Sequence, residues 1–142
     1  MFNLESAYLD VAAIEEGRWL PLGADFPGVE IYARGLSSAP AKALSMKLKR
    51  EAPKKDRILG GQLTEEAEER IRKTVISERC VTDWRGLASG GVPLEFSKAA
   101  LMSILDEPRA RKIAVAIIGA IIDLEQTTEK AEAEVAGNSP AS

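Results

Sequence analysis

The ten residues from Ile113 to Ile122 carry only apolar side chains and one glycine, and this run constrains the fold more than any other segment. It is too short to cross a membrane, because a transmembrane helix needs about 20 apolar residues. A helix that is apolar on most of its faces lies either at the centre of a core or under a binding partner. The run therefore predicts a helix from about Arg109 to Leu124 with one of these two roles.

The composition allows a domain with a real core but omits the residue that catalysis uses most. The chain has 142 residues, enough for one domain, and only 5% are aromatic, so the core is built from Leu, Ile, Val and Ala. It contains no histidine, which removes the commonest general base and metal ligand and excludes Ser-His-Asp and Cys-His nucleophiles. The net charge of -3 argues against a dedicated nucleic-acid binder, because such domains are usually basic. We expect no enzymatic activity, no cofactor and no metal.

The single cysteine, Cys80, cannot form an internal disulfide, which is typical of a protein in a reducing compartment. Without a second cysteine or a histidine, a metal site or a catalytic thiol is not expected, and Cys80 is predicted to be buried in the core. The first residues have no basic start and no long apolar run, so no secretory signal is predicted. We expect a cytoplasmic protein.

Residues 1–36 are predicted to be rich in β-structure. The short segments Val11–Glu16, Arg18–Pro21 and Val29–Ala33 are separated by turn signals that contain glycine and proline. Apolar and polar residues alternate in the later segments, and a period of two is typical of a half-buried hairpin or small sheet. A sheet of this size cannot stand alone and must pack on helices.

Three further helices are predicted from residues that favour helix ends. One begins at Ser37–Pro40, with a capping serine and a proline in its first turn, and ends near Glu51. Thr64 caps a second helix, which has glutamates near its positive end and runs into Trp84. Ser97 caps a short helix ahead of the long apolar one.

The expected fold class is α+β, mostly α-helical, with four to five helices and an N-terminal β-hairpin or small antiparallel sheet. A single globular domain is predicted over residues 1–126, of which residues 1–36 are rich in β-structure and residues 37–126 are helical. From about Thr127 the composition turns polar, so residues 127–142 are predicted to form a flexible tail.

One cluster of basic side chains follows the first long helix into the next loop. It forms a patch for an acidic protein partner or nucleic acid, or simply the solvated face of a helix. No aromatic residues interleave with it to stack bases, which counts against nucleic acid. The candidate basic patch consists of Lys42, Lys47, Lys49, Arg50, Lys54, Lys55 and Arg57.

The glycine-rich segment Gly86–Pro93 is predicted to be structural. It matches neither the Gly-x-x-x-x-Gly-Lys-Ser/Thr pattern of phosphate-binding loops nor the Gly-x-Gly-x-x-Gly dinucleotide pattern. Trp84 is predicted to anchor the second helix in the core, and Trp19 to pack within the hairpin, although tryptophan is also frequent at binding hot spots. The dense carboxylates at 65–69 and 129–134 lie at a helix start and in the tail rather than around one cleft.

The order of elements around Trp84 resembles that of a known family. The run Asp83–Leu87, DWRGL, is followed by a Gly-Gly loop and by a Pro-x-x-Phe-Ser helix start at Pro93–Ser97. Together with an N-terminal hairpin that carries a tryptophan, this order resembles the small tail assembly chaperones of long-tailed bacteriophages and related prophages. The resemblance covers residues 10–125.

The resemblance implies a non-enzymatic role in viral tail assembly. Such chaperones bind the long tape-measure protein and keep it soluble while tail-tube subunits polymerise around it, and they are usually absent from the finished virion. The expected location is the host cell cytoplasm, and the expected partners are the tape-measure protein, the major tail-tube protein and another copy of the chain. The candidate partner-binding residues on the last two helices are Leu101, Ile104, Leu105, Ile113, Ile117 and Ile121.

Three other interpretations stay open. A small structural virion protein, such as a head-tail connector or tail-completion component, fits the same phage setting. A nucleic-acid-binding regulator would act through the basic residues between Lys42 and Arg57. An enzyme would need carboxylates and a divalent metal in place of histidine, and the sequence names no convergent cluster for them.

Overall fold

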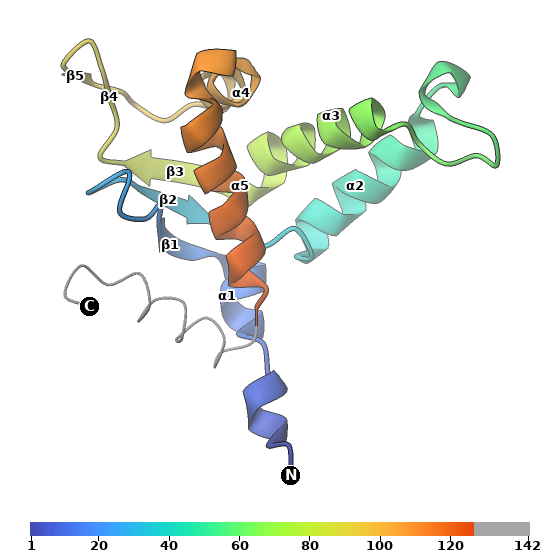
Figure 1. Ribbon diagram of the computed structural model, residues 1–142, viewed down its shortest axis with the longest axis horizontal. Helices are drawn as coiled ribbons and strands as arrows, with labels where there is room; N and C mark the ends of the chain where they lie inside the picture. Colours follow the sequence, from blue (N-terminus) through green and yellow to red (C-terminus); the bar gives the residue numbers. More distant parts are fainter. Residues whose placement is uncertain (127–142) are drawn as a thin grey trace.

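A small antiparallel sheet organises the chain, which the computed structural model describes over residues 1–126 (Figure 1). Its strand order is β1–β2–β3, and the strands span Arg18–Pro21, Glu30–Ala33 and Val81–Arg85. Ile31 on the central strand is fully buried. The predicted α+β fold, mostly helical with a small antiparallel sheet, is confirmed.

The predicted continuation of the second helix to Trp84 is wrong. The helix α3 covers Glu65–Val75 and is followed by a π-helical turn, η3 (Ile76–Cys80). The chain then becomes strand β3, which pairs with β2 as the third strand of the sheet. Trp84 therefore lies on a strand, and the sheet contains a strand that the sequence did not indicate.

An irregularity in the pairing of β3 explains this error. Val81 pairs with Ala33 whereas Asp83 pairs with Tyr32, so the register shifts and Thr82 is left over as a bulge. The two buried residues of the strand, Val81 and Trp84, are consequently three positions apart instead of two. A spacing of three is the spacing of neighbours on a helix face.

The segment Val11–Glu16 was expected to be a strand, but it is the helix α1. The side chain of Asp10 accepts a hydrogen bond from the backbone N–H of Ala13 at 3.1 Å, which caps the helix start. Ala13 and Ile14 are buried, so the apolar side of this single short helix faces the core. Gly17, with φ of 89°, ends the helix and leads into β1.

Helices α2 (Ala39–Glu51) and α3 form an antiparallel hairpin that projects from the sheet (Figure 1). A short 3-10 turn, η2 (Lys54–Asp56), lies in the connection at its tip. The predicted start and end of α2 are confirmed, although the hydroxyl of Ser38 donates to the carbonyl of Gly35 at 2.6 Å instead of capping the helix. The predicted cap of α3 by Thr64 is also confirmed, since its Oγ1 accepts a hydrogen bond from the backbone N–H of Ala67, the third residue of the helix.

The glycine-rich segment after β3 forms a two-stranded hairpin. Strands β4 (Ala88–Ser89) and β5 (Val92–Pro93) are antiparallel and are joined by Gly90 and Gly91. Both glycines have positive φ, 59° and 79°, which a tight turn of this kind requires at its two central positions. The segment therefore has a structural reason for its glycines.

Helix α5 (Arg111–Leu124) crosses one face of the sheet, and α4 (Lys98–Asp106) packs against α5, α3 and η3 (Figure 1). Helix α4 is capped by Ser97, as predicted; the 3-10 turn η4 (Pro108–Ala110) connects it to α5. Within residues 1–126, no helix combines the length and the hydropathy needed to cross a bilayer. The predicted tail, residues 127–142, lies outside the described residues.

Candidate protein-interaction surfaces

The six residues predicted to bind a partner lie on α4 and α5, but most of them face inward. Leu101, Ile117 and Ile121 have no exposed surface, and Leu105 is 6% exposed. Ile104 and Ile113 are half-buried and pack against the same core. In this fold the inner side of the apolar run is core, and a partner that touches α5 must do so from the other side.

The outer side of α5 also carries apolar residues. Val115 and Ile122 are 61% and 49% exposed, and the half-buried Ile118 and Gly119 lie between them. Positions three and four residues apart share one face of a helix, so these four residues form a continuous strip, the outer stripe of α5. Because every residue of the run is apolar, the sequence alone could not separate this stripe from the core face.

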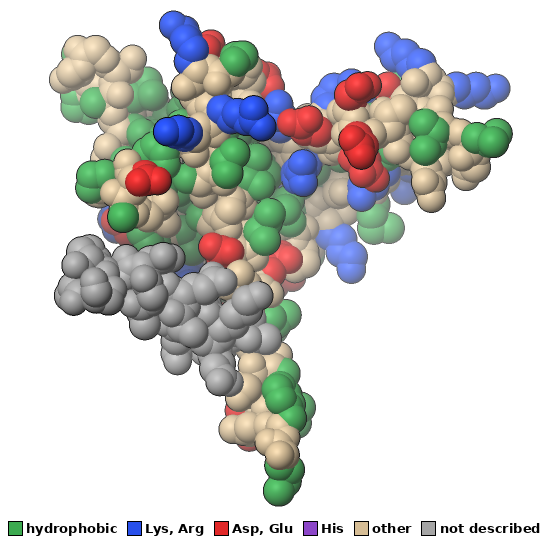
Figure 2. Space-filling view, in the orientation of Figure 1, with side chains coloured by type: hydrophobic (Ala, Val, Ile, Leu, Met, Phe, Trp, Pro, Cys, Tyr) green, Lys and Arg blue, Asp and Glu red, His purple; other side chains and the backbone are tan. Residues whose placement is uncertain are grey.

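Charged side chains flank the outer stripe of α5 at both ends. Arg111 and Lys112 are exposed at the start of the helix, and Asp123 is exposed near its end, where it accepts a hydrogen bond from the amide of Gln126 at 3.0 Å. Figure 2 shows basic side chains near the upper end of α5, acidic ones near the lower end and apolar ones between. The helix macrodipole favours the reverse arrangement, with acids at the start and bases at the end.

A second exposed apolar surface lies on the N-terminal arm, residues 1–10, which projects from the body of the molecule (Figures 1 and 2). The arm contains the 3-10 turn η1 (Leu4–Ala7), none of whose residues is buried. Phe2 is 77% exposed, and Leu4 and Leu9 are exposed as well. These residues fall in the segment predicted to be rich in β-structure, and no sequence signal marks them as a binding surface.

A third exposed apolar surface is the tip of the α2–α3 hairpin, where Leu59 and Ile58 point into solvent next to Lys54 and Lys55. The guanidinium of Arg57 donates hydrogen bonds to the backbone carbonyls of Lys49 and Ala52, at the end of α2, and of Gly61 in the loop, which holds the loop against the helix. The six other members of the predicted basic patch are exposed along α2 and η2. Arg57 therefore stabilises the loop, whereas the other six basic side chains are exposed to solvent.

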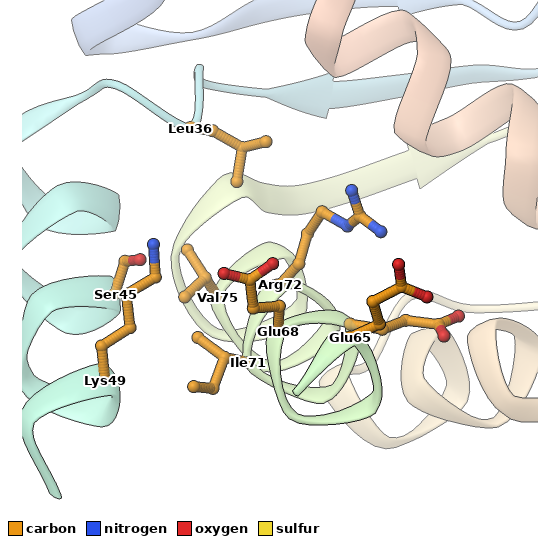
Figure 3. A pocket seen from close by; sticks show the side chains of 9 residues that line it. Leu36, Ser45, Lys49, Glu65, Glu68, Ile71, Arg72 and Val75 are labelled. Carbon is orange, nitrogen blue, oxygen red and sulfur yellow. The ribbon is translucent and has the colours of Figure 1, made fainter. Parts of the chain in front are cut away.

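A groove of about 550 Å³ runs between α2 and α3 (Figure 3). Its apolar lining comes from Leu36, Ile71 and Val75. Lys49 approaches from α2, while the α3 side carries Arg72 and three glutamates, Glu65, Glu68 and Glu69. The basic helix α2 therefore faces a surface of mixed charge, which is not the uniformly positive groove that tracks a nucleic-acid backbone.

Trp84 is a packing residue of the sheet. It is 5% exposed, its Nε1 donates a hydrogen bond to the carbonyl of Leu94 at 2.8 Å, and its ring meets Phe96 edge to face with centroids 5.0 Å apart. These contacts tie β3 to the segment before α4. Trp19 packs edge to face on Tyr32, and the guanidinium of Arg85 lies over the Trp19 ring, 4.0 Å from its centroid.

Cys80 is fully buried at the end of η3, and its Sγ lies 3.9 Å from the carbonyl oxygen of Gly35. Burial, aided by the negative charge of Glu125 and opposed by Arg34, raises the pKa of the Cys80 thiol from 9.0 to about 12. The thiol is therefore protonated at neutral pH and is a poor nucleophile. Among the described residues, no group of three or more His, Cys, Asp or Glu side chains could hold a metal ion.

Comparison with known proteins relates the chain to a prophage protein family. A protein-family model described as "YdaY prophage protein" matches residues 36–138, which is most of the chain and runs from just before α2 past the end of α5. No curated protein and no solved structure matches significantly.

Proposed function

Because the chain belongs to the YdaY prophage protein family, we propose that it is a phage tail assembly chaperone that binds the tape-measure protein and helps tail-tube subunits assemble around it. The family description supports a phage-related role, and the DWRGL element and the helix start at Ser97 support the chaperone role through their resemblance to tail assembly chaperones. The proposed activity is binding without catalysis, in the host cytoplasm, by a protein that is absent from the mature virion.

The main support for this proposal is that the fold exposes several large apolar side chains to solvent. The N-terminal arm exposes Phe2 and Leu4, and the tip of the α2–α3 hairpin exposes Leu59. Large exposed apolar surfaces on soluble proteins typically mark sites for other proteins. Both surfaces lie on parts that project from the body, so they can reach a long client from two directions (Figure 1).

A helical client fits these surfaces well. An amphipathic helix binds by laying its apolar face on exposed apolar side chains, and a long helical protein offers many such faces in a row. A chaperone with apolar groups on an arm and on a hairpin tip can cover such faces until tube subunits replace it. The proposal therefore assigns client binding to the N-terminal arm and the hairpin tip.

Co-expression with the tape-measure protein of the same prophage tests the proposal. The tape-measure protein is expected to become soluble and to co-purify with the wild-type chain. The double variant Phe2→Ser and Leu59→Ser is expected to lose most of this effect, whereas the matched surface control Lys42→Ser and Lys47→Ser retains it. A tape-measure protein that stays insoluble with the wild-type chain would contradict the proposal.

Mass spectrometry of purified particles separates a chaperone from a structural component. A chaperone is expected to be absent from the particle. A head-tail connector or tail-completion protein would be present at a fixed copy number, and that result would replace the chaperone proposal with the structural alternative.

A further inference from the structure

We propose that the outer stripe of α5 is the interface of a symmetric homodimer, in which α5 packs antiparallel against α5 of a second copy. The stripe consists of Val115, Ile118, Gly119 and Ile122, and its two ends are among the more exposed large apolar side chains of the described chain. This proposal does not depend on the proposed function, because it concerns only this chain and uses a surface that the client-binding proposal leaves unassigned.

Gly119 lies in the middle of this stripe, and nothing within residues 1–126 explains a glycine there. Glycine weakens a helix interior relative to alanine. A Cβ built at Gly119 would meet no atom of the described residues within 4 Å, so this part of the fold leaves room for a side chain there. A glycine on an exposed apolar helix face is explained by the close approach of another helix, whose backbone or side chain fills the space.

The charges around the stripe select a second copy of the chain as the partner. Basic residues flank its first turn and an acidic residue flanks its last turn, so the surface is complementary to itself when it is turned end to end. A two-fold axis between Ile118 and Gly119 places Val115 opposite Ile122 of the second copy. The same axis brings Lys112 beside Asp123 of the second copy, because both residues lie on the same side of the stripe. Each of these contacts occurs twice, as an isologous interface requires.

Antiparallel pairing also accounts for the reversed charges on α5. Within one chain, Arg111 and Lys112 lie at the positive end of the helix macrodipole, which disfavours them. In the dimer the negative end of the partner helix lies beside that end, together with its acidic residue. The arrangement that is unfavourable in the monomer becomes favourable in the pair.

The size of the interface sets the expected affinity. Helix α5 has 14 residues and is therefore about 21 Å long. A pair of helices of this length buries less area than a standard stable interface of roughly 1,600 Å². A dimer in the micromolar range is expected, so it forms at high concentrations and dissociates on dilution.

Sedimentation equilibrium of the full-length chain from about 1 to about 500 µM tests the proposal. The wild-type chain is expected to show a monomer–dimer equilibrium. Lys112→Glu and Asp123→Lys are each expected to weaken the dimer by roughly tenfold or more, because each creates like charges across the interface. A mixture of the two variants is expected to recover wild-type affinity as a heterodimer, in which both charged pairs are again opposite in sign.

Two further variants test whether the dimer forms through the outer stripe of α5. Gly119→Ala favours the helix but inserts a methyl group at the closest approach, so it is expected to weaken the dimer by roughly tenfold while circular dichroism stays unchanged. Lys42→Glu makes the same charge change in the early part of α2 and is expected to leave the equilibrium unchanged. A chain that stays monomeric throughout, or a dimer that none of the three α5 substitutions weakens, would overturn the proposal and would leave the proposed function standing.

Discussion

Helices α3 and α5 both pack one side on the core, but their charges run in opposite directions along the helix axis. Three of the first four residues of α3 are glutamates, and Arg72 and Lys73 lie in its last turn, as the macrodipole favours. Helix α5 has no acidic residue in its first turn and no basic residue in its last. The charges of α3 stabilise its own helix, whereas those of α5 find their explanation in a partner.

The two helices also differ in how they treat their apolar residues. Helix α3 buries Ala67, Ile71 and Val75 on one side and is charged on the rest of its surface. Helix α5 buries Ile117 and Ile121 on its inner side but carries another apolar strip on its outer side. A helix with one apolar face can bury that face in the core of its own chain. A helix with two apolar faces leaves the second one exposed and available to a partner.

The largest expected effect separates the two sides of α5. Ile117→Ala is expected to lower the free energy of unfolding by about 2–5 kcal/mol, because it opens a cavity at a site with no exposed surface. Val115→Ala, on the outer stripe, is expected to change it by no more than about 0.5 kcal/mol. Urea unfolding at low protein concentration measures both values, and equal losses would contradict the division of α5 into two faces.

A pH-dependent effect is expected where the chain continues from α3 into the core. The folded chain holds the Cys80 thiol at a pKa of about 12 against an ordinary 9.0, so burial of the neutral thiol contributes fully below pH 9. As the pH rises from about 9 towards 12, the unfolded thiol ionises first and the free energy of unfolding falls by about 1.4 kcal/mol per pH unit. Comparing the alkaline slope of the wild-type chain with that of Cys80→Ala isolates this contribution, and identical slopes would rule it out.

A smaller effect is expected at the start of α3. Thr64 Oγ1 accepts a hydrogen bond from the N–H of Ala67 at 3.1 Å, so Thr64→Ala is expected to cost about 1 kcal/mol of unfolding free energy. Thr64→Ser keeps the acceptor and is expected to recover most of this loss. Helix α5 is preceded by Ala110, which has no side-chain acceptor to cap the helix, so α5 offers no matching cap to remove. Thermal unfolding of the two Thr64 variants checks the difference.

Capping residues and apolar periodicity predicted the helical part of the fold well. Thr64 and Ser97 begin their helices through side-chain hydrogen bonds, and this local chemistry does not depend on the rest of the chain. The N-terminal pairing of β1 with β2 was likewise indicated by alternation along Val29–Ala33. Such signals succeed because each is decided within a few residues.

The errors occurred where distant parts of the chain decide the structure. The bulge at Thr82 gives β3 a helix-like spacing of buried residues, and only the pairing with β2 reveals the strand. Val11–Glu16 is too short for periodicity to decide, and the cap from Asp10 outweighs its β-branched residues. For the candidate site, the uniformly apolar run does not indicate which residues face outward, so the prediction names the buried Ile117 and Ile121 and misses the exposed Val115 and Ile122.

The measurement that tests the comparison of α3 with α5 most directly is the Tm of wild-type chain, Lys112→Glu and Glu65→Lys at two protein concentrations. At the low concentration, Lys112→Glu is expected to gain about 0.3–1 kcal/mol from the macrodipole and Glu65→Lys to lose a similar amount. At the high concentration, the Tm of the wild-type chain and of Glu65→Lys is expected to rise through dimerisation, whereas that of Lys112→Glu is expected to rise less, because its dimer is weaker. If Lys112→Glu destabilised the dilute chain, or if its Tm rose with concentration as the wild-type Tm does, the account of α5 as a partner-facing helix would be contradicted.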